Sequence, residues 1–342
     1  MKSIGIKKRS RKVVSVSRQE MVKQHGMEPH GTPLTLEPAM PGVDLAAWVK
    51  DHRQQVDDLL MEHRALLMRG FDIPNLEAFQ AVVAASSSGE LLQYKDRSTP
   101  RFEVGSGVYV STIYPPDQRI KLHNEGTYWM AWPLKIYFCC LVPSTTGGET
   151  PICDVRKVYE SIDPEIRAEF ERRKIMYVRN YNHGVGLTWQ EAYQASDPKE
   201  AEAYLEANGI EWEWGAEQRL RTRQIRPAVR IHPKSGEKVW FNHGAFFHIS
   251  SQEKEVQAQL RASFGLENLP YNTYFGDGEP IRDDVIAHIR QAYEKNTLKF
   301  LWQQGDVLLL DNMTFAHGRE SYTGDRNIVV AMVDKQTDQP AA

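Results

Sequence analysis

Three residues of the chain could together hold a redox metal: His123, Glu125 and His317. His123-Asn-Glu125 is the only segment with a histidine two residues before an acid. In an extended segment, positions i and i+2 point to the same face, so this imidazole and this carboxylate can bind one ion. Two histidines and one carboxylate bind non-haem iron in this way and leave positions open for other ligands. The third ligand must then come from elsewhere in the chain.

His317 is the natural candidate for that third ligand, because it follows a strongly apolar segment. Residues 307–310 read Val-Leu-Leu-Leu, which is typical of a buried strand, and the polar residues after them lead to His317-Gly-Arg319. Function is often found where such a strand runs into a loop. We therefore expect His317 to join the metal-binding pair.

Arg326 is the candidate for an anion-binding residue. It opens the predicted strand 327–333, and a turn at Gly324 would return that strand beside residues 307–310, with Arg326 near His317. A guanidinium at the inner end of a strand is costly to bury unless it meets a carboxylate, and its planar fork suits one bidentately. That carboxylate is expected to belong to a cosubstrate.

The composition describes a globular protein with a large core and no global affinity for polyanions. The chain has 342 residues, 41% of them hydrophobic and 25% charged, and 42 Lys and Arg against 45 Asp and Glu give a net charge of -3. This charge excludes a global field for nucleic acid or an anionic membrane. No segment approaches the roughly 18 to 20 apolar residues of a membrane span, and the first residues of the sequence lack the apolar core that is typical of a secretory signal. We expect a cytoplasmic protein without nucleic-acid or membrane partners.

The three cysteines, Cys139, Cys140 and Cys153, have neither the number nor the spacing of a disulfide framework or a thiolate zinc site, which indicates a reducing compartment. A single domain is expected over residues 21–335, since no linker or repeat interrupts it. Residues 1–20 carry seven Lys and Arg before the first acid, Glu20, and are interpreted as a flexible basic arm. Residues 336–342 are interpreted as a C-terminal tail.

The predicted elements alternate irregularly. Apolar periodicity and capping residues predict helices at 44–64, 76–86, 163–174, from 188, around 200–207, and near 251–264 and 283–296. Strands are predicted at 65–70, 134–141, 175–181, 228–232, 238–242, 306–310 and 327–333. This order argues against a repeated βαβ wind, and it favours a mainly β sandwich or jelly roll with flanking helices.

Four motifs resemble, in order, those of the taurine dioxygenase (TauD/TfdA) superfamily of Fe(II)- and 2-oxoglutarate-dependent dioxygenases. They are His123-x-Glu125, Gly147-Gly-Glu-Thr150, His317-Gly-Arg319 and Arg326. The similarity spans about residues 35–335 and is closest to the hydroxylases of syringomycin-type nonribosomal peptide pathways, through segments 122–125, 239–242, 311–313 and 316–319. It implies a double-stranded β-helix, the jelly roll of clavaminate synthase-like enzymes.

The resemblance also implies roles for individual residues. His123, Glu125 and His317 would be the catalytic Fe(II) ligands, with 2-oxoglutarate and dioxygen as cosubstrates. Arg326 would pair with the distal carboxylate of 2-oxoglutarate, and Thr150 would hydrogen-bond to the same end.

Three further residues are expected to contact the small molecules. Arg319 would steady the cosubstrate or the substrate, and Asn124 and Asn242 are candidates for substrate binding.

Two departures from the family pattern bear on the reaction. Many members have Asp at the position of Glu125, and related halogenases have Gly or Ala there so that chloride can bind; Glu125 therefore argues against halogenation. Taurine dioxygenase has a second Arg four residues after its cosubstrate Arg, where this chain has Val330. The absence of this second guanidinium suits a substrate whose carboxyl group is masked, such as an aminoacyl thioester on a peptidyl carrier protein. Another residue could equally bind a free amino acid.

We therefore expect a hydroxylase of an amino-acid-type substrate, free or carrier-tethered, in antibiotic or other specialised-metabolite biosynthesis. Desaturation, epoxidation or cyclisation by the same cofactors is an open alternative. A non-catalytic jelly roll that binds a carrier or nucleic acid through the basic arm is another, and so is a zinc hydrolase, since zinc accepts the same ligands.

The key residues also have structural alternatives. The two histidines could be satisfied core residues, and Arg326 could pair with Asp325 or Asp311. Arg319 could pair with the adjacent Glu320, and Thr150 could cap a strand.

Overall fold

The computed structural model describes residues 21–27, 31–87, 96, 103–105, 108–110, 114–181 and 184–337. The predicted basic arm, residues 1–20, lies outside the described residues, and so do residues 338–342 of the predicted tail. The tail was predicted to begin at residue 336, but residues 336 and 337 belong to a strand that ends at Thr337. Among the described residues, no helix is long and apolar enough to cross a membrane.

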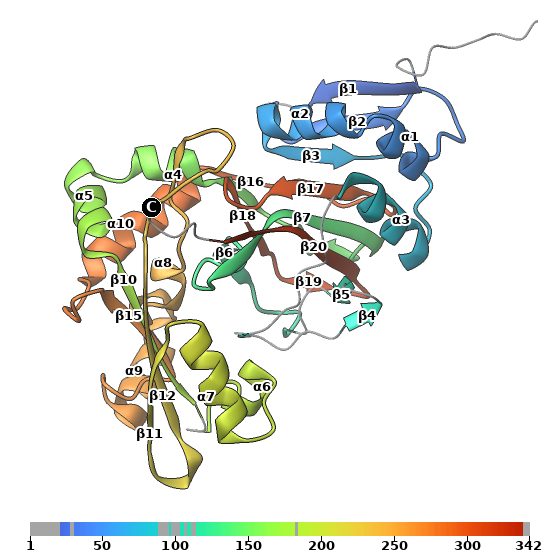
Figure 1. Cartoon of the computed structure of the whole chain (residues 1–342). Helices are drawn as coiled ribbons and strands as arrows, with labels where there is room; N and C mark the ends of the chain where they lie inside the picture. The colour runs from blue at the N-terminus through green and yellow to red at the C-terminus, as the bar shows by residue number, and fades with distance from the viewer. Residues whose placement is uncertain are drawn as a thin grey trace, which may run out of the picture.

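An eight-stranded sheet runs through the molecule (Figure 1). Its strands are, in spatial order, β1 (Val22–Gly26), β2 (Leu34–Pro38), β3 (Ala65–Met68), β17 (Val307–Asp311), β7 (Ala131–Val142), β20 (Asn327–Thr337), β5 (Val108–Val110) and β4 (Glu103–Gly105). The strand β7 pairs with β17 on one side and β20 on the other. It is therefore a central strand.

The two faces of this sheet contribute to two different cores, because successive side chains of a strand point to opposite faces. Tyr137 and Cys139 of β7 pack with Leu309 in one cluster, against three helices. Phe138 packs in the other cluster, with Leu310. The three helices are α1 (Leu45–Asp51), α2 (Arg53–His63) and α3 (Leu76–Ser86). They cover the face of the sheet that carries Tyr137 and Cys139.

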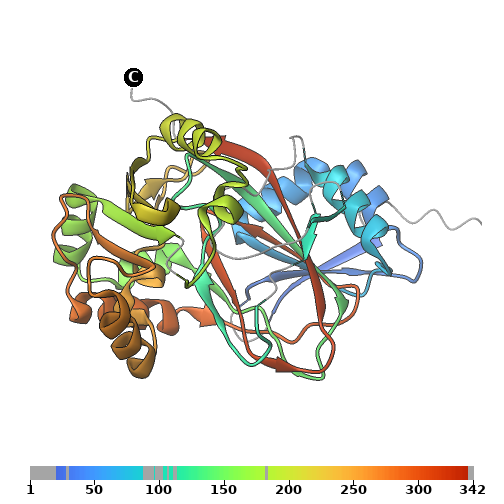
Figure 2. The ribbon, with the colours of Figure 1, turned by 90° about the horizontal axis from the view of Figure 1, so that it is seen from below.

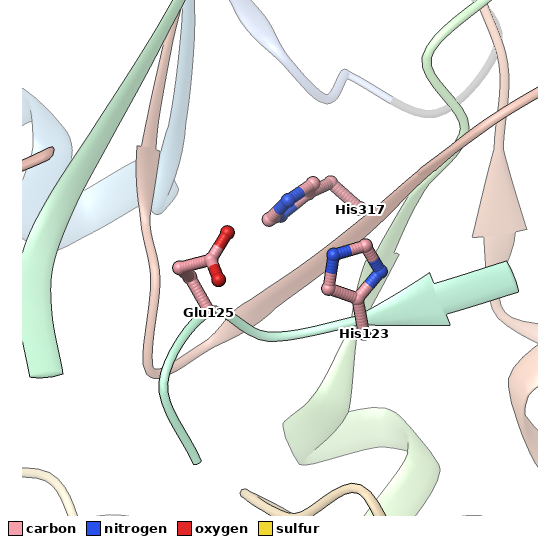
Figure 3. A group of neighbouring side chains, drawn as sticks. All are labelled: His123, Glu125 and His317. Carbon is pink, nitrogen blue, oxygen red and sulfur yellow. The ribbon is translucent and has the colours of Figure 1, made fainter. Parts of the chain in front are cut away.

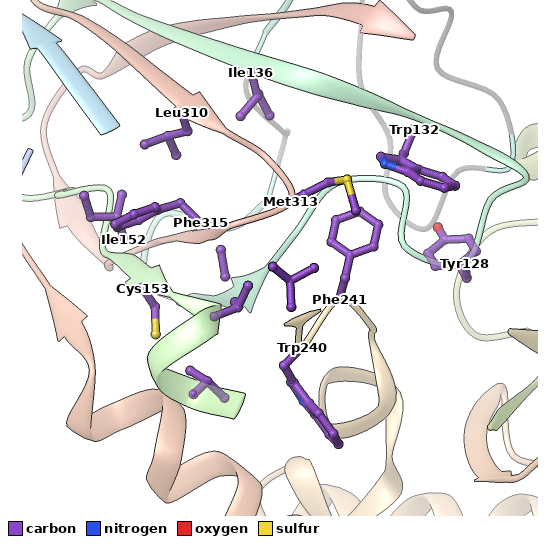
Figure 4. Packing of buried hydrophobic residues seen from close by; sticks show 14 of the residues in the cluster. Tyr128, Trp132, Ile136, Ile152, Cys153, Trp240, Phe241, Leu310, Met313 and Phe315 are labelled. Carbon is purple, nitrogen blue, oxygen red and sulfur yellow. The ribbon is translucent and has the colours of Figure 1, made fainter. Parts of the chain in front are cut away.

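A four-stranded sheet packs against the second face of the large sheet. Its strands are, in order, β16 (Thr297–Leu298), β9 (Ile152–Asp154), β18 (Phe315–Arg319) and β6 (Ile120–His123). Ile152 and Phe315 from this sheet lie beside Ile136 and Leu310 from the large sheet (Figure 4). A short ladder of β8 (Thr146–Gly147) and β19 (Tyr322–Thr323) lies on the path between the two sheets. The candidate ligand His317 is thus placed on a strand that faces the inside of a two-sheet barrel.

The central part of the chain forms a second group of elements on the side opposite α1–α3 (Figure 2). Its sheets are β11 (Glu211–Trp214), β12 (Leu220–Arg226), β10 (Ile175–Tyr181) and β15 (Tyr271–Phe275), and the pair β13 (Arg230–Ile231) and β14 (Lys238–Val239). Its helices are α4 (Val155–Ser161), α5 (Pro164–Arg173), α6 (Trp189–Tyr193), α7 (Pro198–Ala207), α8 (Gly244–Phe247), α9 (Lys254–Phe264) and α10 (Asp283–Lys295), with short 3-10 turns at Ala216–Gln218 and Ile249–Ser251.

Several elements predicted from local sequence signals are present, whereas strands such as β1, β2, β12 and β15 were not predicted. The helix predicted from Asn75 is α3, and the Asn75 side chain accepts a hydrogen bond from the Ala78 amide, as an N-cap does. The capping box predicted at Thr188 is formed with Glu191. The strand predicted at 175–181 is β10.

Two further predictions of the fold were wrong. The single helix predicted over 44–64 is two helices, because His52 leaves the helical region at φ -120° and its ring stacks on Trp48 with Nδ1 2.8 Å from the Trp48 carbonyl oxygen. The strand that begins at Asn327 does not return beside β17: β7 lies between them. Between β17 and β20 the chain passes through the four-stranded sheet as β18, so β17 and β20 do not form a hairpin.

Candidate active site

The two candidate histidines face each other across neighbouring strands. β18 lies between β6 and β9, and His317 is in register with His123 of β6. Directly opposed residues of an antiparallel pair share one face, and the two rings lie 4.6 Å apart between centroids. Glu125 follows two residues after His123, where the chain turns away from β6 (Figure 3). The structure therefore brings the three predicted ligands to one place.

The donor atoms of this group fit a single metal ion. One ligand atom from each of His123, Glu125 and His317 lies within 4.8 Å of the others. Glu125 and His317 are buried, and His123 is half-buried. Two imidazoles and one carboxylate are the donor set of non-haem iron.

Aromatic rings lie against the two histidines of this group. Phe138 of β7 lies 4.9 Å from the His317 ring, and Phe246 of α8 lies 5.3 Å from the His123 ring. His243, one residue before α8, lies 5.6 Å from His123 and hydrogen-bonds to Thr127. Burial, and then the neighbouring His123, lower the pKa of His243 well below its usual range, so it is a neutral imidazole. Phe138 and Phe246 were not predicted, because only the packing of distant elements brings them here.

Arg326 lies against the Gly-Gly turn and lacks a carboxylate partner among the described residues. Its Nε donates to the Gly148 carbonyl at 3.0 Å, and its guanidinium lies 5.5 Å from the Tyr322 ring. Burial, and then the nearby Arg319, lower the pKa of Arg326 to about 10. The suggested alternative partner Asp311 pairs instead with Arg64 and His232. A half-buried cation of this kind is able to receive the carboxylate of a small molecule.

Thr150 precedes β9 and has a partner that the sequence did not indicate. The indole Nε1 of Trp302 donates to Thr150 Oγ1 at 3.1 Å. A hydroxyl that accepts one hydrogen bond still carries its own proton to donate. Thr150 is buried, two residues beyond the glycine that contacts Arg326. Trp302 was missed because its contact spans 152 residues of sequence.

The guanidinium of Arg319 is engaged within the protein. Its Nη1 donates to the Tyr114 carbonyl at 3.0 Å, and its Nη2 donates to the carbonyls of Pro115 and Gln118 at 2.6 and 2.8 Å. The adjacent Glu320 pairs with Arg119 and Lys299 rather than with Arg319. Arg319 thus fixes the loop 114–118, and its expected contact with a cosubstrate stays a prediction.

The two candidate asparagines also bind main-chain groups. Asn242 donates from Nδ2 to the Ala228 carbonyl at 2.8 Å and accepts from the Gly244 amide at 2.9 Å. Asn124 donates from Nδ2 to the Asn312 carbonyl at 2.7 Å. Both side chains are buried. These bonds describe local structural roles, and substrate binding by either residue stays a prediction.

The model of the "Taurine catabolism dioxygenase TauD, TfdA family" matches residues 30–332. The chain belongs to this family. The dapdiamide synthesis protein DdaC of Enterobacter agglomerans is 42% identical over 279 residues, which cover 82% of this chain and 84% of DdaC. The chain is therefore an Fe(II)- and 2-oxoglutarate-dependent dioxygenase, and the non-catalytic and zinc-hydrolase interpretations are set aside. Its particular closeness to syringomycin-type hydroxylases stays a prediction.

Solved structures agree on the fold of this TauD/TfdA-family enzyme. PvcB of Pseudomonas aeruginosa matches with a TM-score of 0.56 at 15% identity, covering 93% of this chain and 94% of PvcB. A second PvcB structure, described as an Fe, alpha-ketoglutarate dependent oxygenase from an isonitrile synthetic pathway, has a TM-score of 0.52 at 18% identity and covers 88% of this chain and 85% of that one. The expected jelly roll with flanking helices is confirmed.

Proposed function

We propose that this dioxygenase hydroxylates an unactivated carbon of an amino-acid-type substrate, free or carrier-tethered, in specialised-metabolite biosynthesis. His123, Glu125 and His317 hold Fe(II). The observation that carries the proposal is the approach of their donor atoms to within 4.8 Å inside the barrel. Bound iron, with 2-oxoglutarate and dioxygen, supplies the oxidant for attack on an unactivated carbon–hydrogen bond.

The protein's own part is to bind, orient and exclude water. In this proposal Arg326 receives the distal carboxylate of 2-oxoglutarate, and Thr150, whose hydroxyl oxygen already accepts from Trp302, donates its proton to the same carboxylate. Two fixed donors define the direction in which the cosubstrate extends toward the metal. Phe138 and Phe246 cover the imidazole ligands with apolar surface, which keeps bulk water from the reacting carbon.

Two observations support the substrate class. DdaC is named for dapdiamide synthesis, and PvcB belongs to an isonitrile synthetic pathway; both pathways make specialised metabolites. Val330, which stands where taurine dioxygenase has a second Arg, is buried in the barrel core in register with Phe138. The valine side chain has no guanidinium to bind a free carboxylate, which suits a substrate whose carboxyl group is masked as a thioester.

The substrate class is tested by mass spectrometry. The enzyme with Fe(II), 2-oxoglutarate and dioxygen is offered amino acids, free and as thioesters on a carrier protein, while succinate and product mass are followed. We expect succinate formation to rise with an amino-acid-type substrate and the product to gain one oxygen atom. Loss of two hydrogens would instead establish desaturation. Coupling only to substrates that lack an amino-acid unit would contradict the proposed class.

Gly148 provides a test of the cosubstrate site that replaces none of the proposed metal-binding or cosubstrate-binding residues. It has φ +72°, and a Cβ there would lie 2.5 Å from Oγ of Ser144 and 3.1 Å from Cδ and Nε of Arg326. Gly148→Ala is expected to displace Arg326 and raise the 2-oxoglutarate requirement several-fold, in addition to about 1–2 kcal/mol of backbone strain. The measurement is KM for 2-oxoglutarate.

The matched control for that variant is Gly236→Ala. Gly236 has φ +71°, so it carries the same strain, but a Cβ there meets nothing within 4 Å. Its KM for 2-oxoglutarate is expected to equal that of the wild type. Equal values for the two variants would show that contact with Arg326 does not matter.

A further inference from the structure

The side chain of Asn312 is hydrogen-bonded to both sides of the Glu125 main chain. Its Oδ1 accepts from the Glu125 amide at 2.8 Å, and its Nδ2 donates to the carbonyls of Glu125 at 2.9 Å and Pro133 at 2.8 Å. A primary amide has two N–H donors, and both are used here. Asn312 is completely buried, at 0% exposure. Its side chain therefore acts on the main chain around a candidate metal ligand and on β7.

The main chain of Asn312 makes a third contact with the same segment. Its carbonyl oxygen accepts from Nδ2 of Asn124, which is also completely buried. Residues 124 and 125 are thus attached to Asn312 by three hydrogen bonds: one from the Asn124 side chain and two at the Glu125 peptide groups. These bonds fix the chain just where it leaves β6, beyond the sheet pairing that positions His123.

Asn312 itself stands on a rigid turn. The preceding residue, Asp311, has its Oδ2 3.1 Å from Nη1 of Arg64 and 3.0 Å from Nε2 of His232. Asp311 Oδ1 accepts from the amides of residues 313 and 314. The turn 311–314 joins β17 to β18, the strand that carries His317. The same hydrogen-bonded turn therefore holds residues 124 and 125 and leads directly into the strand that carries His317.

We propose that Asn312 is a positioning residue of the metal centre, which holds the Glu125 main chain so that its carboxylate meets an ion bound by His123 and His317. The inference rests on the proposed function, because it takes these three residues as the ligands. A ligand on a chain segment that is already ordered loses less conformational freedom when it binds metal. Groups that orient metal ligands typically contribute about 10- to 100-fold in metal affinity.

The test is metal binding by the apoprotein without 2-oxoglutarate. Mn(II) is titrated anaerobically and followed by the electron paramagnetic resonance of the free ion, and the visible spectrum of bound Co(II) reports coordination geometry. Asn312→Ala is expected to weaken Mn(II) binding about 10- to 100-fold and to alter the Co(II) spectrum. Wild-type affinity and spectrum in this variant would overturn the proposal.

Asn296→Ala is the matched control. Asn296 follows α10 and donates from Nδ2 to the Ala292 carbonyl at 2.8 Å and Ser161 Oγ at 3.1 Å, so its replacement removes two side-chain hydrogen bonds, against three for Asn312. Its Mn(II) affinity is expected to match the wild type. An equal loss of affinity in both variants would show a general loosening of the fold and would also overturn the proposal.

Asn124→Ala is a second variant that leaves the Asn312 side chain intact, which keeps the test decisive if Asn312→Ala does not fold. Only the bond to the Asn312 carbonyl is lost, and a several-fold weakening of Mn(II) binding is expected. If Asn124 served only to bind substrate, Mn(II) affinity would be unchanged, which would contradict the positioning role. Failure of the wild-type protein to bind Mn(II) would instead contradict the proposed function itself.

Discussion

Replacing Glu125 by alanine is expected to abolish product formation and to lower Fe(II) affinity by roughly a hundredfold or more, since it removes the only anion among the three proposed ligands. Two neutral imidazoles remain, which hold a divalent ion poorly. The fold is expected to persist, because His123 stays paired with His317 through the strands β6 and β18. Anaerobic metal titration, product analysis and circular dichroism measure the three effects.

Two variants control this experiment. Glu125→Asp keeps the anion at the position where many family members have Asp, so it is expected to retain measurable metal binding and turnover. Glu255→Ala removes an exposed acid from α9 and is expected to behave as the wild type. Unchanged product formation by Glu125→Ala would exclude this residue as a ligand.

Arg326→Gln is expected to raise the 2-oxoglutarate requirement about tenfold to a hundredfold, the equivalent of a charge-assisted pair of about 1.5–3 kcal/mol. Glutamine keeps a hydrogen-bond donor but loses the charge and the fork that suit a carboxylate. The measurement is KM for 2-oxoglutarate, with Fe(II) affinity determined separately. Metal affinity should not change, because Arg326 is not among the proposed ligands.

Arg282→Gln is the matched control for the loss of an arginine. Arg282 is exposed and pairs with Asp284 at the surface, where such pairs contribute little. Its KM for 2-oxoglutarate is expected to equal that of the wild type. If Arg326→Gln showed the same KM as this control, the cosubstrate carboxylate would have to be bound elsewhere.

The metal centre was the part of the site that the sequence predicted best, because two of its three ligands, His123 and Glu125, are two residues apart. The spacing of His123 and Glu125 places both beside one strand end, and the apolar run before His317 identifies a buried strand. The sequence did not contain the register that places His317 opposite His123. The order of the family motifs supplied that pairing indirectly.

Long-range contacts were beyond the sequence pattern. Asn312 was noted only as part of a motif, and its bonds to Glu125 span 187 residues. The predicted pairing of β20 with β17 was wrong because local turn signals do not reveal that β7 lies between these two strands and pairs with both. Likewise, the carbonyls that accept hydrogen bonds from Arg319 belong to a loop that lies 201 to 205 residues away in the sequence.

The most direct test is the anaerobic visible spectrum of the purified protein with Fe(II) and 2-oxoglutarate. Chelation of iron by the cosubstrate produces a weak metal-to-ligand charge-transfer band before any substrate is added. We expect this band in the wild type and its loss in His317→Ala, which removes a ligand on β18. Absence of the band in the folded wild-type protein, or its persistence unchanged in His317→Ala, would contradict the assignment of His123, Glu125 and His317 as the iron site.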